Sequence, residues 1–367
     1  MHICHVYKDF YPPVVGGIEK YLSLISKYQK EMAEITVLVC GKKWSPKVIE
    51  IDGIRVIYSG EVMRVLSAPI SPQLLYYSKT LRPDIFVVHT PNPIGEIAVW
   101  INRSKVPYVI RYHSDVVRQR IPMMLYKPFF KRVLREAKFI IPTSIIYQQT
   151  SHLLGEFQSK CRVVPLGIEV DFFSAVDEQK VKEVKNKYSD EFVFFCGVHR
   201  YYKGLHILLE SAKEIDIPIV IGGDGPERKK LENMKRKEGL KNVVFVGSLP
   251  DDELKYYLYG CALFVFPSIA RSEAFGISII EAHACGKPVV ATKLGTGVEW
   301  ANLDGITGIN VTPGNPKELA QAIDFLIKNP DIREEMGKIA KERVQREFDI
   351  KKTSKFEMEI YKMALNQ

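Results

Sequence analysis

The sequence predicts an α/β protein of two domains, each built around its own parallel sheet. Its 367 residues, 46% hydrophobic and 26% charged, are enough to bury two separate cores. Continuous runs of β-branched and aromatic residues alternate with helical segments, which is typical of parallel sheets covered on both faces. The alternation stops in the charged stretch 174–190 and starts again at Phe192, which indicates a second sheet.

The first half alternates in order from the N-terminus. A strand at residues 2–7 leads through a loop ending in Gly16 and Gly17 into a helix from Ile18 to about Met32. Further strands are expected at residues 35–40, 54–58, 84–89, 107–112, 139–142 and 162–165. Ligands of such sheets gather beyond the carboxyl ends of the strands. The loops after these strands are therefore the expected place for a site.

The second half repeats the pattern. Strands are expected to end at Gly197, before the glycine loop 222–225, at Gly247, at Pro267 and at Ala291. Helices are expected after Pro250, after Gly276 and over residues 316–328, and the last helices cover about 331–367. Two similar sheets joined in this way are expected to face each other across a central cleft.

Two carboxylates, Glu273 and Glu281, flank a helix start that could bind an anion. Gly276 lacks a side chain, so backbone N–H groups at this turn can approach a ligand at the positive end of the helix dipole. The residues of this turn that are candidates to contact such a ligand are Phe275, Gly276, Ile277 and Ser278. A phosphate there, with hydroxyls held by a glutamate on either side, describes a nucleotide sugar. The alternative is a buried helix entry with two solvated glutamates.

A second candidate anion site follows Gly197. Arg200 and Lys203 come soon after this strand end, and paired cations suit a diphosphate leaving group. Arg200 could equally be a solvated surface residue. Gly223 ends the next strand in a glycine loop.

Two features of the first half are weaker signals. Gly16 and Gly17 would let backbone amides approach a phosphate at a helix start, although a tight turn has the same requirement. They do not form a dinucleotide fingerprint, because no Gly-x-Gly-x-x-Gly is present. His113 follows a strand, where a hydrogen-bonded structural histidine is the common alternative.

Taken in order, these segments resemble the group 1 retaining glycosyltransferases of the GT4 type. The resemblance rests on Gly16-Gly-Ile-Glu19, His113, Leu166-Gly-Ile-Glu-Val-Asp171, Lys203, Gly223-Asp-Gly-Pro226, the Glu273-x7-Glu281 spacing and Gly295-Thr-Gly297. It implies a GT-B fold of two facing Rossmann-like domains, residues 1–172 on the acceptor side and 173–346 binding the nucleotide sugar. Residues 347–367 are then a helix crossing back to the first domain.

The resemblance also implies a reaction and residue roles. A hexose moves from a GDP- or UDP-linked donor to an acceptor hydroxyl with retention at C1, without a cofactor or a dedicated metal. Glu273 holds the sugar hydroxyls, Glu281 the ribose and His113 the transferred sugar, while Lys203 stabilises the leaving diphosphate. The family usually has arginine where this chain has Val198, and Arg200 is the candidate substitute. A lipid-linked or polysaccharide acceptor is expected.

Two other functions stay open. A sugar-nucleotide epimerase could use the same fold, although its catalytic carboxylate and histidine set is not found. A donor-binding or membrane-associated partner without turnover is a further alternative, because Val198 replaces the expected arginine.

The net charge of +9 is concentrated in the first half, especially at residues 101–138. Residues 121–138 interleave large apolar residues with Lys127, Lys131, Arg132, Arg135 and Lys138. Such a helix can lie on an anionic membrane surface, or it can be an ordinary domain helix packed on the sheet. No nucleic-acid-reading motif accompanies the charge.

The cysteine pattern and the hydropathy indicate a cytoplasmic location. The six cysteines lie in or beside apolar runs without metal-type spacing, as expected for reduced core residues. No apolar run is long enough to cross a membrane, and no signal-peptide pattern begins the sequence. The protein is therefore expected in the cytoplasm, with attachment to the membrane's cytoplasmic face left open.

Overall fold

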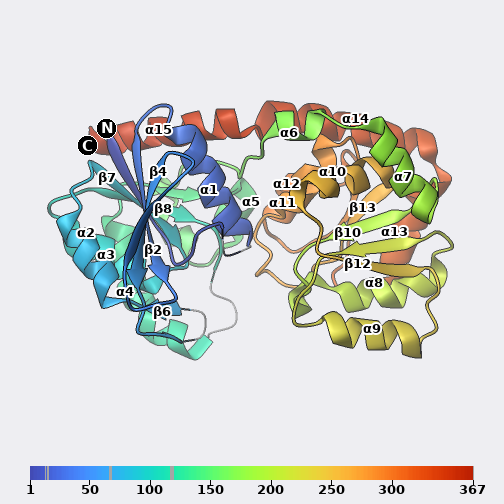
Figure 1. Cartoon of the computed structure of the whole chain (residues 1–367), viewed down its shortest axis with the longest axis horizontal. Helices are drawn as coiled ribbons and strands as arrows, with labels where there is room; N and C mark the ends of the chain where they lie inside the picture. The colour runs from blue at the N-terminus through green and yellow to red at the C-terminus, as the bar shows by residue number, and fades with distance from the viewer. Residues whose placement is uncertain (13, 15, 66–67, 116–119, 367) are drawn as a thin grey trace. The chain divides into compact units, whose positions relative to one another are not determined.

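The computed structural model of the chain describes residues 1–12, 14, 16–65, 68–115 and 120–366. It divides into two compact units, one made of Met1–Gly167 with Ile350–Gln367 and the other of Ile168–Asp349. In each unit a sheet lies between helices (Figure 1). The predicted α/β class with two sheets is therefore confirmed.

The first unit has a seven-stranded sheet in the order β3-β4-β2-β1-β7-β8-β9. Its strands are β1 (His2–Val6), β2 (Glu34–Gly41), β3 (Lys47–Ile51), β4 (Ile54–Gly60), β7 (Ile85–Thr90), β8 (Tyr108–Tyr112) and β9 (Ile140–Pro142). All neighbours pair in parallel except β3 and β4, which form an antiparallel edge. The short strands β5 (Met63–Val65) and β6 (Ala68–Ile70) pair separately. The sequence reasoning did not expect β3, β5 or β6.

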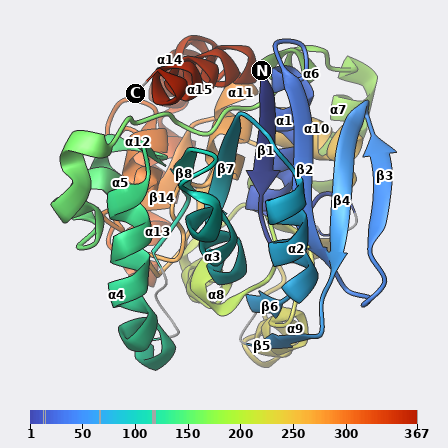
Figure 2. The ribbon, with the colours of Figure 1, turned by 90° about the vertical axis from the view of Figure 1, so that its left-hand side faces the viewer.

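Helices cover both faces of the first sheet (Figure 2). One face carries α1 (Gly17–Gln29) and α15 (Ile350–Leu365), whose buried residues join the strands in one apolar cluster. Elsewhere in the unit lie α2 (Pro72–Thr80), α3 (Pro93–Asn102), α4 (Arg120–Glu136), α5 (Ile145–Thr150) and the 3₁₀ segment η1 (Leu154–Lys160). Local sequence fixes several starts: Ser71 caps α2, which has Pro72 in its first turn, and Ser144 caps α5.

The predicted strand at residues 162–165 is wrong. The N–H groups of Arg162 and Val164 do donate to carbonyls of the β9 segment, at 2.9 and 3.1 Å. Pro165 has no N–H to continue a ladder. The guanidinium of Arg111 instead takes the carbonyls of Val164 and Pro165, at 2.8 and 3.3 Å. The segment therefore pairs with β9 only through these N–H groups and a single bridge between Ile140 and Cys161, and the side chain of Arg111 takes its carbonyls.

The second unit has a six-stranded, fully parallel sheet in the order β12-β11-β10-β13-β14-β15. Its strands are β10 (Val193–Cys196), β11 (Ile219–Gly222), β12 (Val243–Gly247), β13 (Leu263–Phe266), β14 (Val289–Thr292) and β15 (Gly308–Val311). The edge strand β15 was not predicted as a strand. β10 lies in the middle of the order, beside β11 and β13, and this order brings the loops after these strands together.

The helices of the second unit pack against its sheet and share an apolar cluster with its strands. They are α6 (Val170–Ser174), α7 (Glu178–Tyr188), α8 (Leu205–Ser211), α9 (Arg228–Lys237), α10 (Asp251–Gly260), α11 (Ile277–Ala284), α12 (Gly297–Ala301), α13 (Pro316–Lys328) and α14 (Pro330–Glu347), with 3₁₀ segments η2 (Tyr201–Lys203) and η3 (Ala212–Glu214). Asn315 caps α13, and Thr296 with Glu299 forms a capping box at α12. Among the described residues of both units, none of the helices combines the length and apolarity needed to span a bilayer.

Candidate functional site

Two predicted glycines meet at the carboxyl edge of the second sheet. Gly197 follows β10 and Gly223 follows the neighbouring strand β11. Gly223 has a φ of +102°, and a Cβ there would come 2.0 Å from the carbonyl oxygen of Gly197. Only residues without side chains allow this approach. The structure therefore leaves main chain, and no side chain, at this part of the edge.

The start of α11 is open at its positive end. Gly276 has a φ of +84°, and a Cβ there would come 2.9 Å from Ile279 Cδ1 and 3.1 Å from the Phe266 ring. Gly276 is the N-terminal cap of this helix and has no side chain with which to cap it. The first N–H groups of a helix, here those of Ile277 and Ser278, have no acceptor within it. They are suited to hydrogen-bond an anion, as predicted from the sequence.

Lys203 and Glu273 form an ion pair beside that helix start. Lys203 Nζ lies 2.5 Å from Glu273 Oε2, and both side chains are mostly buried. The same ammonium lies 4.7 Å from the centre of the Phe266 ring, which Gly276 also contacts. The backbone after Lys203 reaches this place because Gly204, with a φ of +68°, lies directly against the carbonyl of Pro267.

Arg200 does not join this pair. It is exposed, and its side chain makes no hydrogen bond or ion pair within the part of the chain that the structure describes. Val198, at the position of the missing arginine, is only partly buried. The structure thus brings Lys203 and Glu273 together and leaves Arg200 outside their contact.

The small-residue loop before α12 is held against the segment that carries Glu273. The N–H of Gly297 donates to the carbonyl of Ala274 at 2.8 Å. Arg271 donates to the carbonyl of Gly295 at 2.6 Å, and Glu299 accepts from the N–H groups of Gly295 and Thr296 at 2.5 and 3.1 Å. These bonds fix two predicted loops, far apart in sequence, as one structure.

The other residues predicted to bind the nucleotide sugar differ in which of their atoms a ligand can reach. Glu281 is buried on α11, about two turns after Gly276. The side chain of Phe275 is buried and packs edge to face on Phe348, with ring centres 5.9 Å apart. Only the backbone of Phe275 is therefore left for a ligand. Ser278 is half-buried in the first turn of α11.

Two polar residues near these strand ends were missed in the sequence. The hydroxyl of Ser268, just after β13, lies 3.5 Å from Glu273 Oε2. His199 is fully buried, and its Nε2 lies 3.2 Å from the carbonyl of Gly222. Burial lowers the pKa of His199. The available signal was the position of His199 two residues after Gly197, where the sequence predicts the strand to end.

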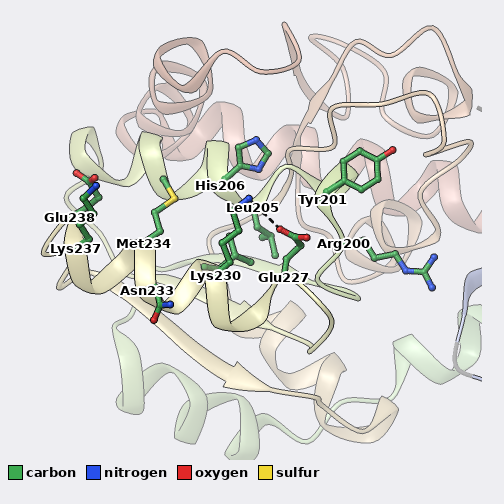
Figure 3. A pocket seen from close by; sticks show the side chains of 11 residues that line it. Arg200, Tyr201, Leu205, His206, Glu227, Lys230, Asn233, Met234, Lys237 and Glu238 are labelled. Carbon is green, nitrogen blue, oxygen red and sulfur yellow. Dashed lines mark ion pairs between the residues drawn. The ribbon is translucent and has the colours of Figure 1, made fainter. Parts of the chain in front are cut away.

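A pocket of about 300 Å³ lies between the start of α8 and helix α9 (Figure 3). Its lining residues include Arg200, Tyr201, His206, Glu227 and Met234. In Figure 3 the guanidinium of Arg200 points away from the other labelled side chains. Arg200 is the one predicted site residue among its lining residues, and neither Lys203 nor Glu273 lines it.

In the first unit, the glycine loop lies against a carboxylate of the protein itself. Gly16 is the N-terminal cap of α1 and has extended backbone angles, while Gly17 begins the helix. A Cβ at Gly16 would come 2.1 Å from Glu19 Oε2. The bare glycine therefore makes room for the Glu19 side chain. A carboxylate at this place interacts favourably with the helix dipole.

His113 is the third of three buried histidines in hydrogen-bonding series. His113 Nε2 lies 2.9 Å from His89 Nδ1, and His89 Nε2 lies 3.0 Å from His5 Nδ1. The pKa of each imidazole is lowered, first of all by burial. The sequence reasoning missed His5 and His89, although His89 ends a predicted strand just as His113 follows one.

Some of the positive charge at residues 101–138 is neutralised by ion pairs inside the first unit. Arg111 is completely buried, and its Nε lies 2.9 Å from Glu357 Oε1. Lys131 pairs with Glu156, and Arg132 pairs with Glu136. On α4, Met124 and Leu125 are 69% and 78% exposed, while Val133 and Leu134 are buried. One end of α4 thus packs in the core and the other presents apolar side chains to solvent.

Metal ligands do not gather at these places. Among the residues that the structure describes, no three His, Cys, Asp or Glu side chains are placed to hold a metal ion. His5, His89 and His113 instead form hydrogen bonds to one another in a row.

Two family models match the chain, one on each half. The model described as "Glycosyl transferases group 1" matches residues 176–343, and "Glycosyltransferase Family 4" matches residues 15–172. The D-rhamnosyltransferase WbpZ of Pseudomonas aeruginosa is 33% identical over 351 residues, covering 95% of this chain and 92% of that protein. The O-antigen chain mannosyltransferase C of Escherichia coli is 33% identical over 354 residues, covering 95% and 94%.

Solved structures share the fold over the full length. HepE of Anabaena, crystallised with UDP and glucose, superposes with a TM-score of 0.82 at 20% identity, covering 99% of this chain and 100% of that one. Sucrose-phosphate synthase of Thermosynechococcus elongatus gives 0.83 at 20% identity, covering 99% and 98%. The GT-B fold class is thereby confirmed.

Proposed function

This chain belongs to the group 1, GT4-type glycosyltransferases, and we propose from this premise that it moves a hexose from a nucleotide diphosphate sugar to an acceptor hydroxyl with retention at C1. That it is a glycosyltransferase acting on a nucleotide sugar follows from the family. The names of its relatives support mannose or rhamnose as the transferred sugar and a polysaccharide chain as the acceptor, and we propose that this chain is lipid-linked.

The observation that carries the proposal is the Lys203–Glu273 pair beside the uncapped start of α11. A departing nucleoside diphosphate gains negative charge as the bond to C1 breaks. Lys203 and the N–H groups at the helix start supply fixed positive charge to stabilise it, where little solvent competes. Glu281, further along the same helix, would hold the ribose hydroxyls.

Glu273 and His113 would hold the transferred sugar. Once Lys203 turns to the diphosphate, the Glu273 carboxylate is free to accept hydrogen bonds from sugar hydroxyls. Fixing the sugar in this way orients C1 for attack by the acceptor on the face that the diphosphate leaves. Arg200 would have to reorient from its exposed position to take the place of the missing arginine.

We propose that no dedicated metal takes part, because the cation and the helix start can supply the required charge stabilisation. Transfer should then persist after dialysis against EDTA. Activity that is lost with EDTA and restored by a divalent cation would contradict this part of the proposal.

The experiment that tests the function combines binding with product analysis. Calorimetry with UDP, GDP and ADP, followed by their sugars, identifies the donor, and the anomeric configuration of the product reports retention. Release of an epimerised sugar nucleotide without acceptor would indicate the epimerase alternative. Binding of the nucleotide sugar with neither hydrolysis nor transfer would indicate a partner protein without turnover. This alternative is worth testing because Val198 stands where the family has arginine and Arg200 is exposed.

We further propose that α4 attaches the first unit to an anionic membrane surface, on its cytoplasmic face, where a lipid-linked acceptor would lie. The support is the exposure of Met124 and Leu125 together with Lys127 on the same part of the helix. Apolar side chains flanked by cations are typical of helices that lie in the headgroup region. Against it stands the neutralisation of several neighbouring cations by ion pairs.

A further inference from the structure

His5, His89 and His113 belong to a longer hydrogen-bonded series that ends on a carboxylate. His5 Nε2 lies 2.8 Å from Gln29 Oε1, and Gln29 Nε2 donates to Glu357 Oε2 at 3.4 Å. With the two contacts between histidines, the series runs from α15 through α1, β1 and β7 to the residue after β8. Every member is buried.

The carboxylate at the end of the series determines which atom donates and which accepts in each of its hydrogen bonds. Glu357 accepts hydrogen bonds from Tyr21 Oη at 2.8 Å and Tyr361 Oη at 2.6 Å, and it forms an ion pair with Arg111, whose Nε lies 2.9 Å away. An ionised carboxylate can only accept hydrogen bonds, so Gln29 must turn its NH₂ group toward Glu357. Its carbonyl oxygen then faces His5 and can only accept.

The direction is passed on through neutral imidazoles. Burial lowers the pKa of all three rings, so each carries one N–H at neutral pH. His5 must donate from Nε2 to Gln29, which leaves its Nδ1 as an acceptor. His89 therefore donates from Nε2 to His5, and His113 donates from Nε2 to His89. The planes of the His89 and His113 rings are within 15° of parallel, which is compatible with an N–H to lone-pair bond between them.

The last atom of the series is the Nδ1 of His113, and it carries a lone pair. It is buried and has no hydrogen-bond partner among the residues that the structure describes. A buried acceptor without a donor is costly and is rare in folded proteins. A donor from a bound ligand would satisfy it.

We propose that Gln29 and Glu357 are positioning residues that fix the tautomer of His113, so that its Nδ1 accepts a hydrogen bond from a sugar hydroxyl. The identity of the ligand as a sugar rests on the proposed function, whereas the tautomer itself does not. His113 in this form discriminates by chemistry: it accepts from a hydroxyl and disfavours a carboxylate or other group that can only accept.

Gln29 disfavours the alternative series, in which each of the three imidazoles is the other tautomer. If every proton moved to the other ring nitrogen, both contacts between histidines would survive, and His113 would present Nδ1–H. The lone pairs of His5 Nε2 and Gln29 Oε1 would then face each other at 2.8 Å. That unmade bond biases the series by roughly tenfold or more toward the proposed direction. Without the amide, the two directions become comparable.

The test is ¹⁵N NMR of the full chain labelled in histidine, with His113 assigned by its loss in His113→Gln. In the wild type we expect a pyridine-type Nδ1 and a pyrrole-type Nε2 for His113. Gln29→Met, which removes the acceptor at similar volume, should give an averaged or reversed pattern. Gln29→Glu should restore the wild-type pattern, because the introduced carboxyl group shares a proton with Glu357 and still presents an acceptor to His5.

Tyr361→Phe is the matched control, since it removes one buried hydroxyl that donates to Glu357 and contacts Gln29, while it keeps Gln29, the three histidines and the ring that packs edge to face on His5. We expect the wild-type tautomer in this variant. A pyrrole-type Nδ1 on His113 in the wild type, or an unchanged tautomer in a folded Gln29→Met, would overturn the proposal.

Kinetics give a second readout. Gln29→Met should lower kcat/KM for sugar transfer by roughly 10- to 100-fold, as the loss of a fixed hydrogen bond to the substrate does, with Gln29→Glu close to wild type. Equal decreases of kcat/KM in the Gln29→Met and Tyr361→Phe proteins would overturn the positioning role of Gln29. If the wild type transfers no sugar at all, the proposed function fails, while the NMR result still decides the tautomer.

Discussion

Lys203 forms an ion pair with Glu273, and a diphosphate must compete with that carboxylate for the lysine. The pair is mostly buried and only 2.5 Å long, so Lys203 has little freedom before a ligand arrives. Part of the attraction between donor and Lys203 is therefore offset by separating the lysine from Glu273. The same step frees Glu273 for the sugar, which couples the two halves of donor recognition.

We predict that Lys203→Ala weakens nucleoside diphosphate binding by about 2 kcal/mol, or roughly 30-fold, because a mostly buried charge contact is lost. Isothermal calorimetry measures it. Lys293→Ala is the matched control, since Lys293 pairs with Asp304 at the exposed surface of the same unit. Equal affinities of the Lys203→Ala and Lys293→Ala proteins would contradict the assigned role.

We predict that truncation of Glu273 and truncation of Glu281 affect different steps. Glu273→Ala should retain nucleoside diphosphate binding and lose sugar transfer, because its expected partners are sugar hydroxyls. Glu281→Ala should weaken binding of the nucleotide itself. Calorimetry with the nucleotide, together with transfer rates at saturating donor, separates these outcomes. Weakened binding in both variants with turnover intact would reverse the assignment.

Glu96 is a buried carboxyl whose charge the fold disfavours. Burial raises its pKa from the ordinary 4.5 to about 7, while the Tyr126 hydroxyl, 2.7 Å away, and the N–H of Asn92 act in the opposite direction. A carboxyl with a raised native pKa stabilises the fold below its unfolded pKa. That contribution is lost as the pH rises through about 7.

We predict that Glu96 contributes about 2–3 kcal/mol at pH 5 that is absent at pH 8. The measurement is denaturant unfolding of the wild type and Glu96→Gln at both pH values. Comparing the two proteins cancels the buried histidines, whose lowered pKa values act in the opposite sense below pH 6.5. Glu31→Gln, at an exposed position, is the control. A wild type and a Glu96→Gln protein with parallel pH profiles would refute the prediction.

Helix α11 depends on one residue for its start. Gly276 adopts a left-handed φ and lies against Phe266 and Ile279, so both its backbone angle and its lack of a side chain are needed. The helix is only eight residues long and has no side-chain cap. Its position therefore comes from packing and from the hydrogen bonds that tie Ala274 to Gly297.

We predict that Gly276→Ala destabilises the second unit by roughly 2–4 kcal/mol, from backbone strain and crowding together, and weakens nucleotide binding. Gly305→Ala is the matched control, because Gly305 has a similar φ of +73° with no atom near its absent side chain. It should cost only the strain, about 1 kcal/mol. Equal losses in the two variants, measured by thermal unfolding, would show that crowding at α11 is unimportant.

Helix α4 is the element through which the membrane proposal can be decided. We predict that Met124→Ser with Leu125→Ser reduces co-sedimentation with anionic vesicles by at least tenfold, because each exposed apolar side chain contributes about 1–2 kcal/mol when buried in the headgroup region. Phe356→Ser, at another exposed apolar position of the first unit, should have no effect. Pelleting that is unchanged in the double variant would remove the membrane claim.

At the scale of the whole molecule, the second unit is one continuous stretch inserted in the first. The chain leaves the first unit after Gly167 and returns to it at Ile350. The returning helix α15 completes the first core with Met358, Ile360, Tyr361 and Ala364, and its Glu357 neutralises the buried Arg111. The first unit therefore needs both ends of the chain.

We predict that the fragment 168–349 folds alone and retains nucleotide binding, because its apolar cluster is complete within it. A chain ending at residue 349 should lose the first unit, since an unpaired buried guanidinium and an open core cost several kcal/mol. Limited proteolysis and circular dichroism distinguish the outcomes. A stable first unit without α15 would contradict this account.

The amino-acid sequence determined the features that depend on neighbours along the chain. Hydrophobic periodicity predicted most strands and helices, and Gly276 between Glu273 and Glu281 marked a helix start suited to an anion. Such patterns are local, because strand and helix periods span only a few residues. They failed at residues 162–165, where the side chain of the distant Arg111 takes the carbonyls that a strand would use.

Tertiary structure alone decided which distant residues meet. The order of the strands placed His5, His89 and His113 side by side, and the return of α15 brought Glu357 to Gln29 and Arg111. The fold also paired Lys203 with Glu273 and left Arg200 outside that contact. These contacts follow from the packing of elements that lie tens to hundreds of residues apart. A single sequence carries no local signal for such contacts.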